Sequence, residues 1–315
     1  MRWAKRSAGD RRKPRKGAAI SGPDGEAAFI AALRAIASTP AARGLIDDAA
    51  VIPIGDEVMV ATHDMIVEGV HYLAGQDPAD VAWRLVATNI SDLAAKGARP
   101  LGVLLGAMLG SPEENARFIA GLGEALAAYD TPLLGGDTVR GTPQRSYGLT
   151  ALGLATHRPV PARSGARVGE ALWITGKVGA AMAGFEALQA GSQDSALTAP
   201  YRRPQARLDE GIALAPHVGA MMDVSDGLLI DAARMARASG VTLAIDSAAV
   251  PIAVAEARRA DALRWGDDYE LLFTAPEGVA LPVPAARIGS VVAGDAGLLL
   301  DGQALAAGER LGWEH

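Results

Sequence analysis

The sequence predicts an α/β fold divided into two domains. Half of the 315 residues are hydrophobic, 37 are Gly and only 4% are aromatic, which favours closely packed helices and strands with small side chains. Segments with helical spacing and segments with strand-like spacing alternate along the chain. A chain of this length is long enough for two ordinary domains with a substantial core.

The first half of the chain begins with a helix and two strands. The apolar residues from Phe29 to Ile36 recur at helical spacing, and Thr39-Pro40 ends this predicted helix. Gly55-Asp56 is a turn signal between two strand-like runs. The helices predicted in this half cover 26–37, 81–96 and a segment from Pro112 to about Tyr129. The predicted strands cover 49–54, 58–62, 101–109 and 146–157, and TPLLGGDTVRG is predicted to form a strand and a turn.

The densest break in the chain, RPVPARSGARVGE, begins at residue 158 and marks the predicted domain boundary. We expect a basic flexible tail over 1–22, an N-terminal domain over 23–157 and a C-terminal α/β domain over 158–315. In the second domain, strands are predicted at ALWITG, VTLAID, ELLFTA and the run that ends in DVSDG. Helices are predicted at 180–190, 208–215 and 228–238, and no helix is predicted in the polar stretch GSQDSALTAPYRRPQAR.

Composition also narrows the class of protein. The net charge of −6 argues against a nucleic-acid partner. Cys is absent, which excludes disulfides and thiolate chemistry and fits a reducing compartment. No apolar run approaches ~18 residues and no apolar segment follows the basic N-terminus, so we expect neither a membrane span nor a secretory signal. A cytoplasmic protein is expected.

Aspartates lie at the ends of several predicted elements, whereas common catalytic signatures are missing. The sequence contains no GxxxxGK[ST], HExxH or GxSxG, and five His without Cys argue against zinc. Each Asp alone is also explained as a helix cap or turn residue. Together they predict a ligand site at strand ends, with Mg²⁺ as the cation suited to oxygen ligands. These residues are Asp47, Asp48, Asp64, Asp137, Asp223, Asp226, Asp267 and Asp268.

Asp92 has two interpretations that the sequence leaves open. It lies four residues before Lys96 on a predicted helix, so the two side chains are positioned to form an exposed ion pair. Alternatively, the same strip adjoins Ile90 and Leu93, which places Asp92 near the core. The sequence also leaves open the role of the two glycines of LLGGDTVRG, because they suit either close approach of a phosphate or a hairpin turn.

Seven motifs, taken in their order along the chain, resemble the thiamine-monophosphate kinase family of the aminoimidazole-ribonucleotide-synthetase-like superfamily. They span residues 25–315, and EGVHY and SDLAAKGA are the most distinctive. The resemblance implies transfer of the γ-phosphoryl group of ATP to thiamine monophosphate, with several Mg²⁺ ions, giving thiamine diphosphate and ADP. It also implies a homodimer whose N-terminal mixed sheets pair with each other. The motifs are DDAAVI, THDMIVEGVHY, NISDLAAKGARP, LLGGDTVRG, ARSGARVGE, DVSDGL and GDDYELLF.

The resemblance also implies a role for individual residues. No protein nucleophile is implied. The implied metal ligands are Asp48, Thr62, Asp64, Asp92, Asp137, Asp223 and Asp226. The implied ATP contacts are Gly136, Asp137, Arg163 and Ser225, and the implied contacts to thiamine monophosphate are His71, Asp267 and Trp313. Asp47 is expected to orient its turn or to cap backbone N–H groups.

The chemistry of phosphoryl transfer fits these roles. The reaction depends mainly on positioning and on neutralising charge on phosphate oxygens, which carboxylate-held Mg²⁺ ions can do. The attacking phosphate oxygen is already ionised, so no general base is required. Trp313 offers a flat face for the cationic thiazolium. The chain departs from the family pattern at Ile46 and Trp265, where Gly is usual, and at His63, where Thr is usual.

Two other functions are consistent with parts of the sequence. One is a relative in the same superfamily that acts on another substrate, such as selenophosphate synthetase, which relies on a Cys or selenocysteine that this chain lacks. The other is a non-catalytic nucleotide-binding or metal-storage protein. That function predicts loss of some metal-binding carboxylates, whereas all those expected here are present.

Overall fold

A computed structural model of the protein describes residues 26–141, 144–306 and 308–313. The described residues belong to two separate units, one ending at Ser38 and the other beginning at Thr39, which are described one at a time. The first unit contains α1 (Glu26–Arg34), the helix predicted at 26–37. The predicted basic tail, residues 1–22, lies outside the described residues.

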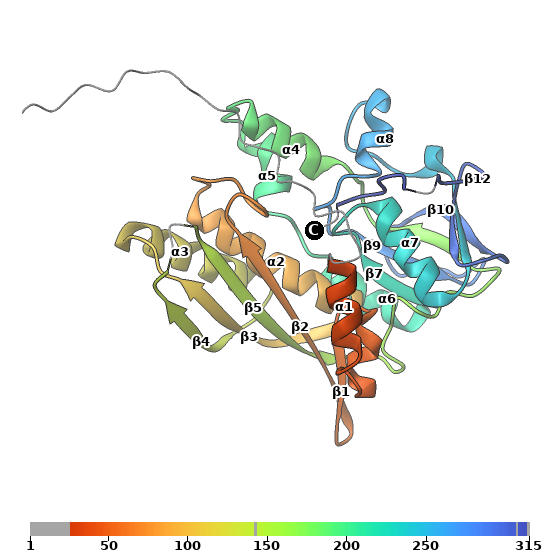
Figure 1. The fold of residues 1–315 in the computed structure, drawn as a ribbon, viewed down its shortest axis with the longest axis horizontal. Coiled ribbons are helices and arrows are strands. Elements are labelled where there is room, and N and C mark those ends of the chain that lie inside the picture. The colour runs from red at the N-terminus through yellow and green to blue at the C-terminus, as the bar shows by residue number, and fades with distance from the viewer. Residues whose placement is uncertain (1–25, 142–143, 307, 314–315) are drawn as a thin grey trace, which may run out of the picture. The chain divides into compact units, whose positions relative to one another are not determined.

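The second unit begins with a five-stranded mixed sheet (Figure 1) in the order β1-β2-β5-β3-β4. Neighbouring strands are antiparallel except β3 and β4, which are parallel. β2 extends to Val67, past the predicted end at Thr62, so Asp64 lies inside a strand rather than after one. The strands are β1 (Ala50–Ile54), β2 (Glu57–Val67), β3 (Ala98–Met108), β4 (Leu133–Val139) and β5 (Ser146–Ala155).

Two helices cover one face of this sheet, and both begin at strong caps. Asp77 caps α2 (Pro78–Ala95) by accepting the N–H of Ala79, and Ser111 with Glu114 forms a capping box at α3 (Pro112–Ala128). α2 packs against β2, β3 and β5, and α3 packs against α2. Phe118 of α3 also stacks on Tyr147 of β5, with ring centroids 4.4 Å apart.

The other face of the first sheet carries exposed apolar side chains. Met65, Leu104 and Leu134, from β2, β3 and β4, are each at least 41% exposed. The register places Met65 and Leu104 on the same face, because Met65 lies opposite Gly148 and Leu104 opposite Thr150 on β5. This open face is therefore apolar in the single chain.

The rest of the second unit is built on a seven-stranded sheet in the order β12-β11-β8-β10-β6-β9-β7. Its strands are β6 (Ala171–Ile174), β7 (Ala220–Asp223), β8 (Thr242–Ile245), β9 (Leu271–Ala275), β10 (Ala286–Val292), β11 (Gly297–Leu300) and β12 (Gln303–Ala304). Its helices are α4 (Ala180–Gln189), α5 (Ser195–Arg202), α6 (Leu208–Leu214), α7 (Leu228–Ser239) and α8 (Arg259–Ala262). Among the described residues, no helix combines the length and the apolarity needed to cross a bilayer.

Helix α5 was not predicted, because it lies in the polar stretch and contains Pro200. Its start is fixed by Asp194, which accepts the N–H groups of Ala196 and Leu197. Its buried residues include Tyr201, which packs edge-on against Phe185 of α4. Capping and the burial of one face therefore override the low apolar content of this segment.

The two sheets meet at the C-terminal half of α2. A buried cluster joins Ala94 and Ala95 of α2 to Leu214 of α6, Met221 of β7 and Phe273 of β9. The small side chains of α2 allow this close contact. As a result, the face of α2 that carries Asp92 is directed toward the end of β7.

Two glycines of α3 provide a test of how tightly α2 and α3 pack. A Cβ at Gly121 would lie 2.1 Å from the backbone oxygen of Ala79, whereas a Cβ at Gly123 would meet nothing within 4 Å. We expect Gly121→Ala to lower the free energy of unfolding by about 1–3 kcal/mol through overpacking. Gly123→Ala should instead raise it by about 0.5–1 kcal/mol, because Ala is the better helix former.

Denaturant-induced unfolding of the two variants and the unchanged protein measures this difference. Equal effects at the two positions would contradict the close helix contact.

Candidate active site

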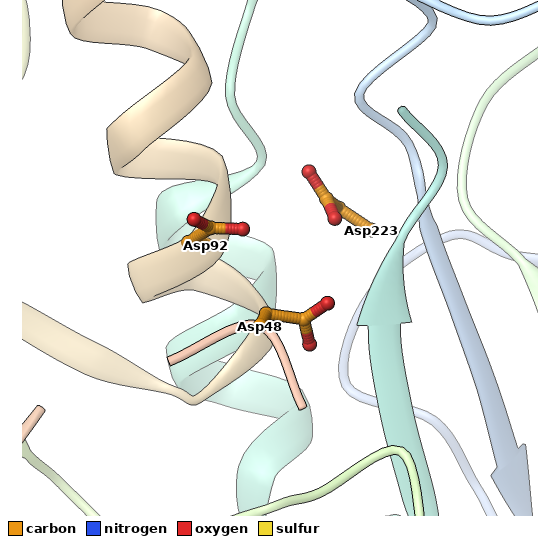
Figure 2. Close-up of side chains that lie close together, drawn as sticks. All are labelled: Asp48, Asp92 and Asp223. Atoms are coloured by element: carbon orange, nitrogen blue, oxygen red, sulfur yellow. The ribbon is translucent and has the colours of Figure 1, made fainter. Parts of the chain in front are cut away.

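Three of the predicted metal ligands converge where α2 approaches the end of β7 (Figure 2). One ligand oxygen from each of Asp48, Asp92 and Asp223 lies within 4.8 Å of the other two. Asp48 comes from the turn before β1, Asp92 from α2, and Asp223 is the last residue of β7. We call these three residues the acidic cluster. The predicted position of Asp92 near the core is therefore correct.

Thr62 and Asp64 on β2 border the acidic cluster. The Thr62 hydroxyl donates a short hydrogen bond to Asp92 and lies 3.3 Å from the backbone oxygen of Asp48. Asp64 is fixed through its backbone, whose N–H donates to the Asn89 side chain over 3.1 Å. Because β2 faces α2, the inward side of this strand brings both residues beside the acidic cluster.

Burial gives the carboxylates of this region an unusual affinity for protons. The pKa of Asp223 is raised to about 8, first by burial and then by the charge of Asp48. Burial also raises the pKa of Asp92 well above its ordinary value, with further contributions from Asp64 and Asp223. The pKa of Asp64 is raised mainly by burial. The surroundings of these carboxyl groups thus disfavour their charged forms.

Two cationic side chains offset part of this charge at Asp48. Lys96 Nζ is completely buried and lies 2.6 Å from Asp48 Oδ2. The guanidinium of Arg163 contacts Asp48 Oδ1, with Nε at 2.7 Å and Nη2 at 2.5 Å. The exposed Asp92–Lys96 pair considered from sequence is therefore wrong, because this face of α2 is buried and Lys96 reaches the turn before β1 instead.

Asp47 shapes the turn that presents Asp48. Its carboxylate accepts the backbone N–H groups of Asp48 at 3.0 Å and Arg163 at 3.2 Å, which confirms the expected capping role. It also pairs with Lys96 Nζ and with Arg43, each at 2.5 Å. Burial alone would raise the pKa of Asp47, but these two cations outweigh burial and hold the pKa well below 3.8.

The DVSDG segment brings two more predicted residues to the same region. It follows β7, and its Asp226 pairs with Arg234 of α7. Burial raises the pKa of Asp64 most, and the charges of Asp48 and Asp226 raise it further. Ser225 is the residue before Asp226, so the predicted nucleotide contact adjoins the predicted metal ligand.

Two of the three predicted substrate contacts bond to the backbone of this segment. The N–H of Asp267 donates to the oxygen of Ser225 over 2.7 Å, and the N–H of Trp313 donates to the oxygen of Asp226 over 2.8 Å. The Asp267 carboxylate pairs with buried Arg84 and accepts the hydroxyl of Tyr269 at 3.2 Å.

Trp313 keeps an exposed face, since 45% of the residue is accessible. The third contact, His71, follows β2, and its Nδ1 accepts the N–H of Val67 at 3.1 Å.

Gly136 and Asp137 are not brought to the acidic cluster within one chain. They lie inside the edge strand β4 rather than in a turn, and all of β4 is exposed. β4 is separated from β2 by β5 and β3. Gly136 is required by packing, because a Cβ there would lie 1.9 Å from the backbone oxygen of Leu105. The hairpin-turn interpretation of these glycines is therefore wrong.

The three departures from the family pattern are accommodated locally. Ile46 has φ −120°, and the positive φ angles of this turn occur at Arg43, Gly44 and Leu45, so the backbone does not require Gly at 46. His63 points away from the acidic cluster, and its Nδ1 lies 2.9 Å from the hydroxyl of Thr150. Trp265 packs against Phe185, with ring centroids 5.3 Å apart.

Sequence reasoning missed several residues that support the site. Ser91 donates its hydroxyl to Asp223 Oδ2 over 2.6 Å, and Arg84 holds Asp267. Asp231 of α7 accepts hydrogen bonds from the segment after β7. Its position in the first turn of a predicted helix was the available signal, since acidic residues are favoured there. No comparable signal identifies Ser91 or Arg84, whose partners are distant in sequence.

The raised pKa of Asp223 predicts how the metal-free protein responds to pH. Its folded pKa of about 8 exceeds the ordinary value of 3.8, so the folded protein keeps a proton that the unfolded chain releases between these pH values. Stability should therefore fall as pH rises through this window, by up to about 1.4 kcal/mol per pH unit for one such group, and then level off.

Thermal unfolding in the presence of a chelator measures this slope. Asp223→Asn should flatten the slope, because the amide does not titrate. A melting temperature that rises with pH across this window in the unchanged protein would contradict the shifted pKa.

Comparisons with known proteins identify the family of the chain. Residues 46–155 match the model of the AIR synthase related protein N-terminal domain, and residues 167–297 match that of the C-terminal domain. Thiamine-monophosphate kinase of Salmonella typhimurium is 37% identical over 257 residues, covering 74% of this chain and 76% of that protein. The enzyme of Caulobacter vibrioides is 35% identical over 303 residues, covering 88% and 86%.

A solved structure extends the similarity to the fold. The structure described as AaThiL complexed with AMPPCP and TMP has a TM-score of 0.84 and 28% identity, and the match covers 92% of this chain and 97% of that one. The paired family domains, the identity to these enzymes and the shared fold lead to one conclusion. The chain belongs to the thiamine-monophosphate kinase family.

Proposed function

We propose that this chain transfers the γ-phosphoryl group of ATP to thiamine monophosphate, giving thiamine diphosphate and ADP. The observation that carries this proposal is the acidic cluster, in which oxygens of three carboxylates from separate elements approach within 4.8 Å of one another. Membership of the family supplies the substrates, because the relatives bear the name of this activity. The similar AaThiL structure was solved with AMPPCP, an ATP analogue, and TMP.

We propose that several Mg²⁺ ions act with ATP, and the residues present fit this cation. Asp48 Oδ2 is buried without a hydrogen bond of good geometry, although Lys96 is near. Burial and neighbouring carboxylates raise the pKa values of Asp92 and Asp223, and a cation bound there would favour their charged forms instead. The carboxylates of the acidic cluster would hold the ions, together with Thr62, Asp64 and Asp226. Bound Mg²⁺ neutralises charge on the transferred phosphoryl group.

The protein residues then act by binding and orienting the substrates. A bond forms between an acceptor phosphate oxygen and the γ-phosphorus, and the bond from the γ-phosphorus to the oxygen that it shares with the β-phosphate breaks. The acceptor oxygen is ionised, so the chain needs neither a nucleophile nor a general base. We assign Ser225 and Arg163 to the nucleotide. We assign His71, Asp267 and Trp313 to thiamine monophosphate, with Trp313 facing the cationic ring.

We further propose that the protein acts as a homodimer joined through the N-terminal domain, residues 23–157, which also binds ATP and metal. The apolar open face of the first sheet supports this arrangement. β4 lies three strand spacings from β2, or about 14 Å, too far for Asp137 to reach the acidic cluster of its own chain. We therefore assign Gly136 and Asp137 to the site of the partner protomer. Residues 158–315 form the second domain, and the cytoplasm is the proposed compartment.

The activity can be tested directly by incubating the protein with ATP, Mg²⁺ and thiamine monophosphate. Chromatography should detect thiamine diphosphate and ADP in equal amounts. Asp223→Asn should lower turnover at least ~10²-fold, because it removes one electrostatic contact to the reacting groups. The control Asp194→Asn should retain activity, since Asp194 caps α5 and Asn caps helices equally well. ADP formation without thiamine diphosphate would overturn the proposed substrate.

The dimer proposal predicts complementation between two inactive variants. Asp137→Asn keeps the acidic cluster, whereas Asp92→Asn keeps Asp137. In a mixed dimer, one of the two sites would then combine the intact acidic cluster of one protomer with the intact Asp137 of the other. Refolding the two variants together should restore about a quarter of normal activity, since half of the dimers are mixed and each has one complete site. If Asp137 acts within its own chain, every site keeps a lesion and the mixture stays inactive.

A further inference from the structure

We propose that Asp231 is a positioning residue that holds the loop Ser225–Gly227 in its binding geometry and thereby serves both substrates. This inference rests on the proposed function, because the loop supplies Ser225 and Asp226. Asp231 is completely buried and belongs to the first turn of α7. The proposed reaction assigns no role to this buried carboxylate.

One oxygen of Asp231 accepts hydrogen bonds from all three N–H groups of the loop. Asp231 Oδ2 accepts hydrogen bonds from Ser225 at 3.1 Å, Asp226 at 3.0 Å and Gly227 at 3.2 Å. Three successive N–H groups that converge in this way form an anion-binding nest, and the N-terminus of α7 also favours a carboxylate. Gly227 is the N-cap and has no side chain to bond these groups. Asp231 therefore fixes the loop from inside the helix.

The carbonyl groups of the same loop are bonded from other segments. The oxygen of Ser225 accepts from Asp267, that of Asp226 from Trp313, and that of Gly227 from Asp231 at 3.0 Å. All three N–H groups and all three C=O groups of the loop therefore have partners. Every backbone N–H and C=O group of the loop is hydrogen-bonded, so contacts from the loop to a ligand would come from the side chains of Ser225 and Asp226.

The second oxygen of Asp231 orients the side chain of Asp226. Asp231 Oδ1 accepts Arg234 Nη1 at 2.8 Å, and the same nitrogen pairs with Asp226. Arg234 is therefore held between the two carboxylates. One buried carboxylate thus fixes both the backbone and the side-chain direction of a proposed metal ligand.

This arrangement links the two ends of the site. Asp267 and Trp313, the proposed substrate contacts, are hydrogen-bonded to the loop that Asp231 anchors. A shift of the loop would move the metal side and the substrate side together. Loss of Asp231 should therefore weaken Mg²⁺ binding and raise the KM values of ATP and thiamine monophosphate, whereas a purely structural residue would change only stability.

Asp231→Asn is the most direct variant, because it keeps the size of the side chain. The neutral amide is a weaker acceptor for the three N–H groups and offers an NH₂ group toward Arg234. We expect Mg²⁺ alone to bind ~10–100-fold more weakly by isothermal titration calorimetry, as for other residues that orient metal ligands. Both KM values should rise in the activity assay.

Glu170→Gln is the matched control. Glu170 is also buried, accepts the N–H of Arg167 at 3.0 Å and the hydroxyl of Thr274 at 2.6 Å, and precedes β6 at the opposite end of the sheet from Asp223. It should lower the melting temperature without changing Mg²⁺ affinity. The proposal is overturned if Asp231→Asn behaves in the same way.

Hydrogen exchange on the unchanged protein provides a test that does not depend on a folded variant. The N–H groups of the loop 225–227 should be protected in the metal-free protein, since Asp231 already bonds them. Exchange at the rate of a free peptide until Mg²⁺ is added would overturn the proposal. The calorimetry and the exchange experiment use no thiamine compound, so they remain decisive even if the proposed substrate is wrong.

Discussion

Burial of several carboxylates between two sheets is the electrostatic constraint on which the rest of the structure depends. Removing a carboxylate from water strongly disfavours its charged form, and neighbouring carboxylates disfavour it further. Lys96 and Arg163 neutralise Asp48, but Asp92 and Asp223 keep raised pKa values. The surroundings of these two carboxyl groups therefore favour their protonated, neutral forms.

The small-residue composition of the chain follows from how this region is assembled. α2 must lie close to the first sheet, to α3, to α6 and to β7 at once. Glycines make the contacts possible: a Cβ at Gly121 or Gly211 would lie 2.1 Å from the backbone oxygen of Ala79 or Ala94. Bulky side chains at these positions would separate the helices and move Asp92 away from Asp223. The scarcity of aromatic residues is thus a consequence of close backbone packing.

Much of this organisation could be predicted from local sequence, and the failures have a physical pattern. Hydrophobic spacing and capping residues located most helices and strands, because those signals act over a few neighbouring residues. The family motifs identified all three members of the acidic cluster. The sequence could not decide between the two interpretations of Asp92 and Lys96, because burial of α2 depends on a distant sheet. The position of Asp137 on an exposed edge strand could not be foreseen, since it depends on strand order rather than on neighbouring residues.

The proposed transfer uses neither a protein nucleophile nor a general base, so it depends on how rigidly the chain holds its substrates. The loop after β7 meets this need through hydrogen bonds from segments far apart in the sequence. Asp267 and Tyr269 adopt positive φ angles of 66° and 51°, which cost energy in residues other than Gly. These conformations let the N–H groups of Asp267 and Tyr269 reach the oxygens of Ser225 and Val224, at 2.7 and 2.8 Å. The surrounding hydrogen bonds therefore stabilise a strained backbone beside the loop that follows β7.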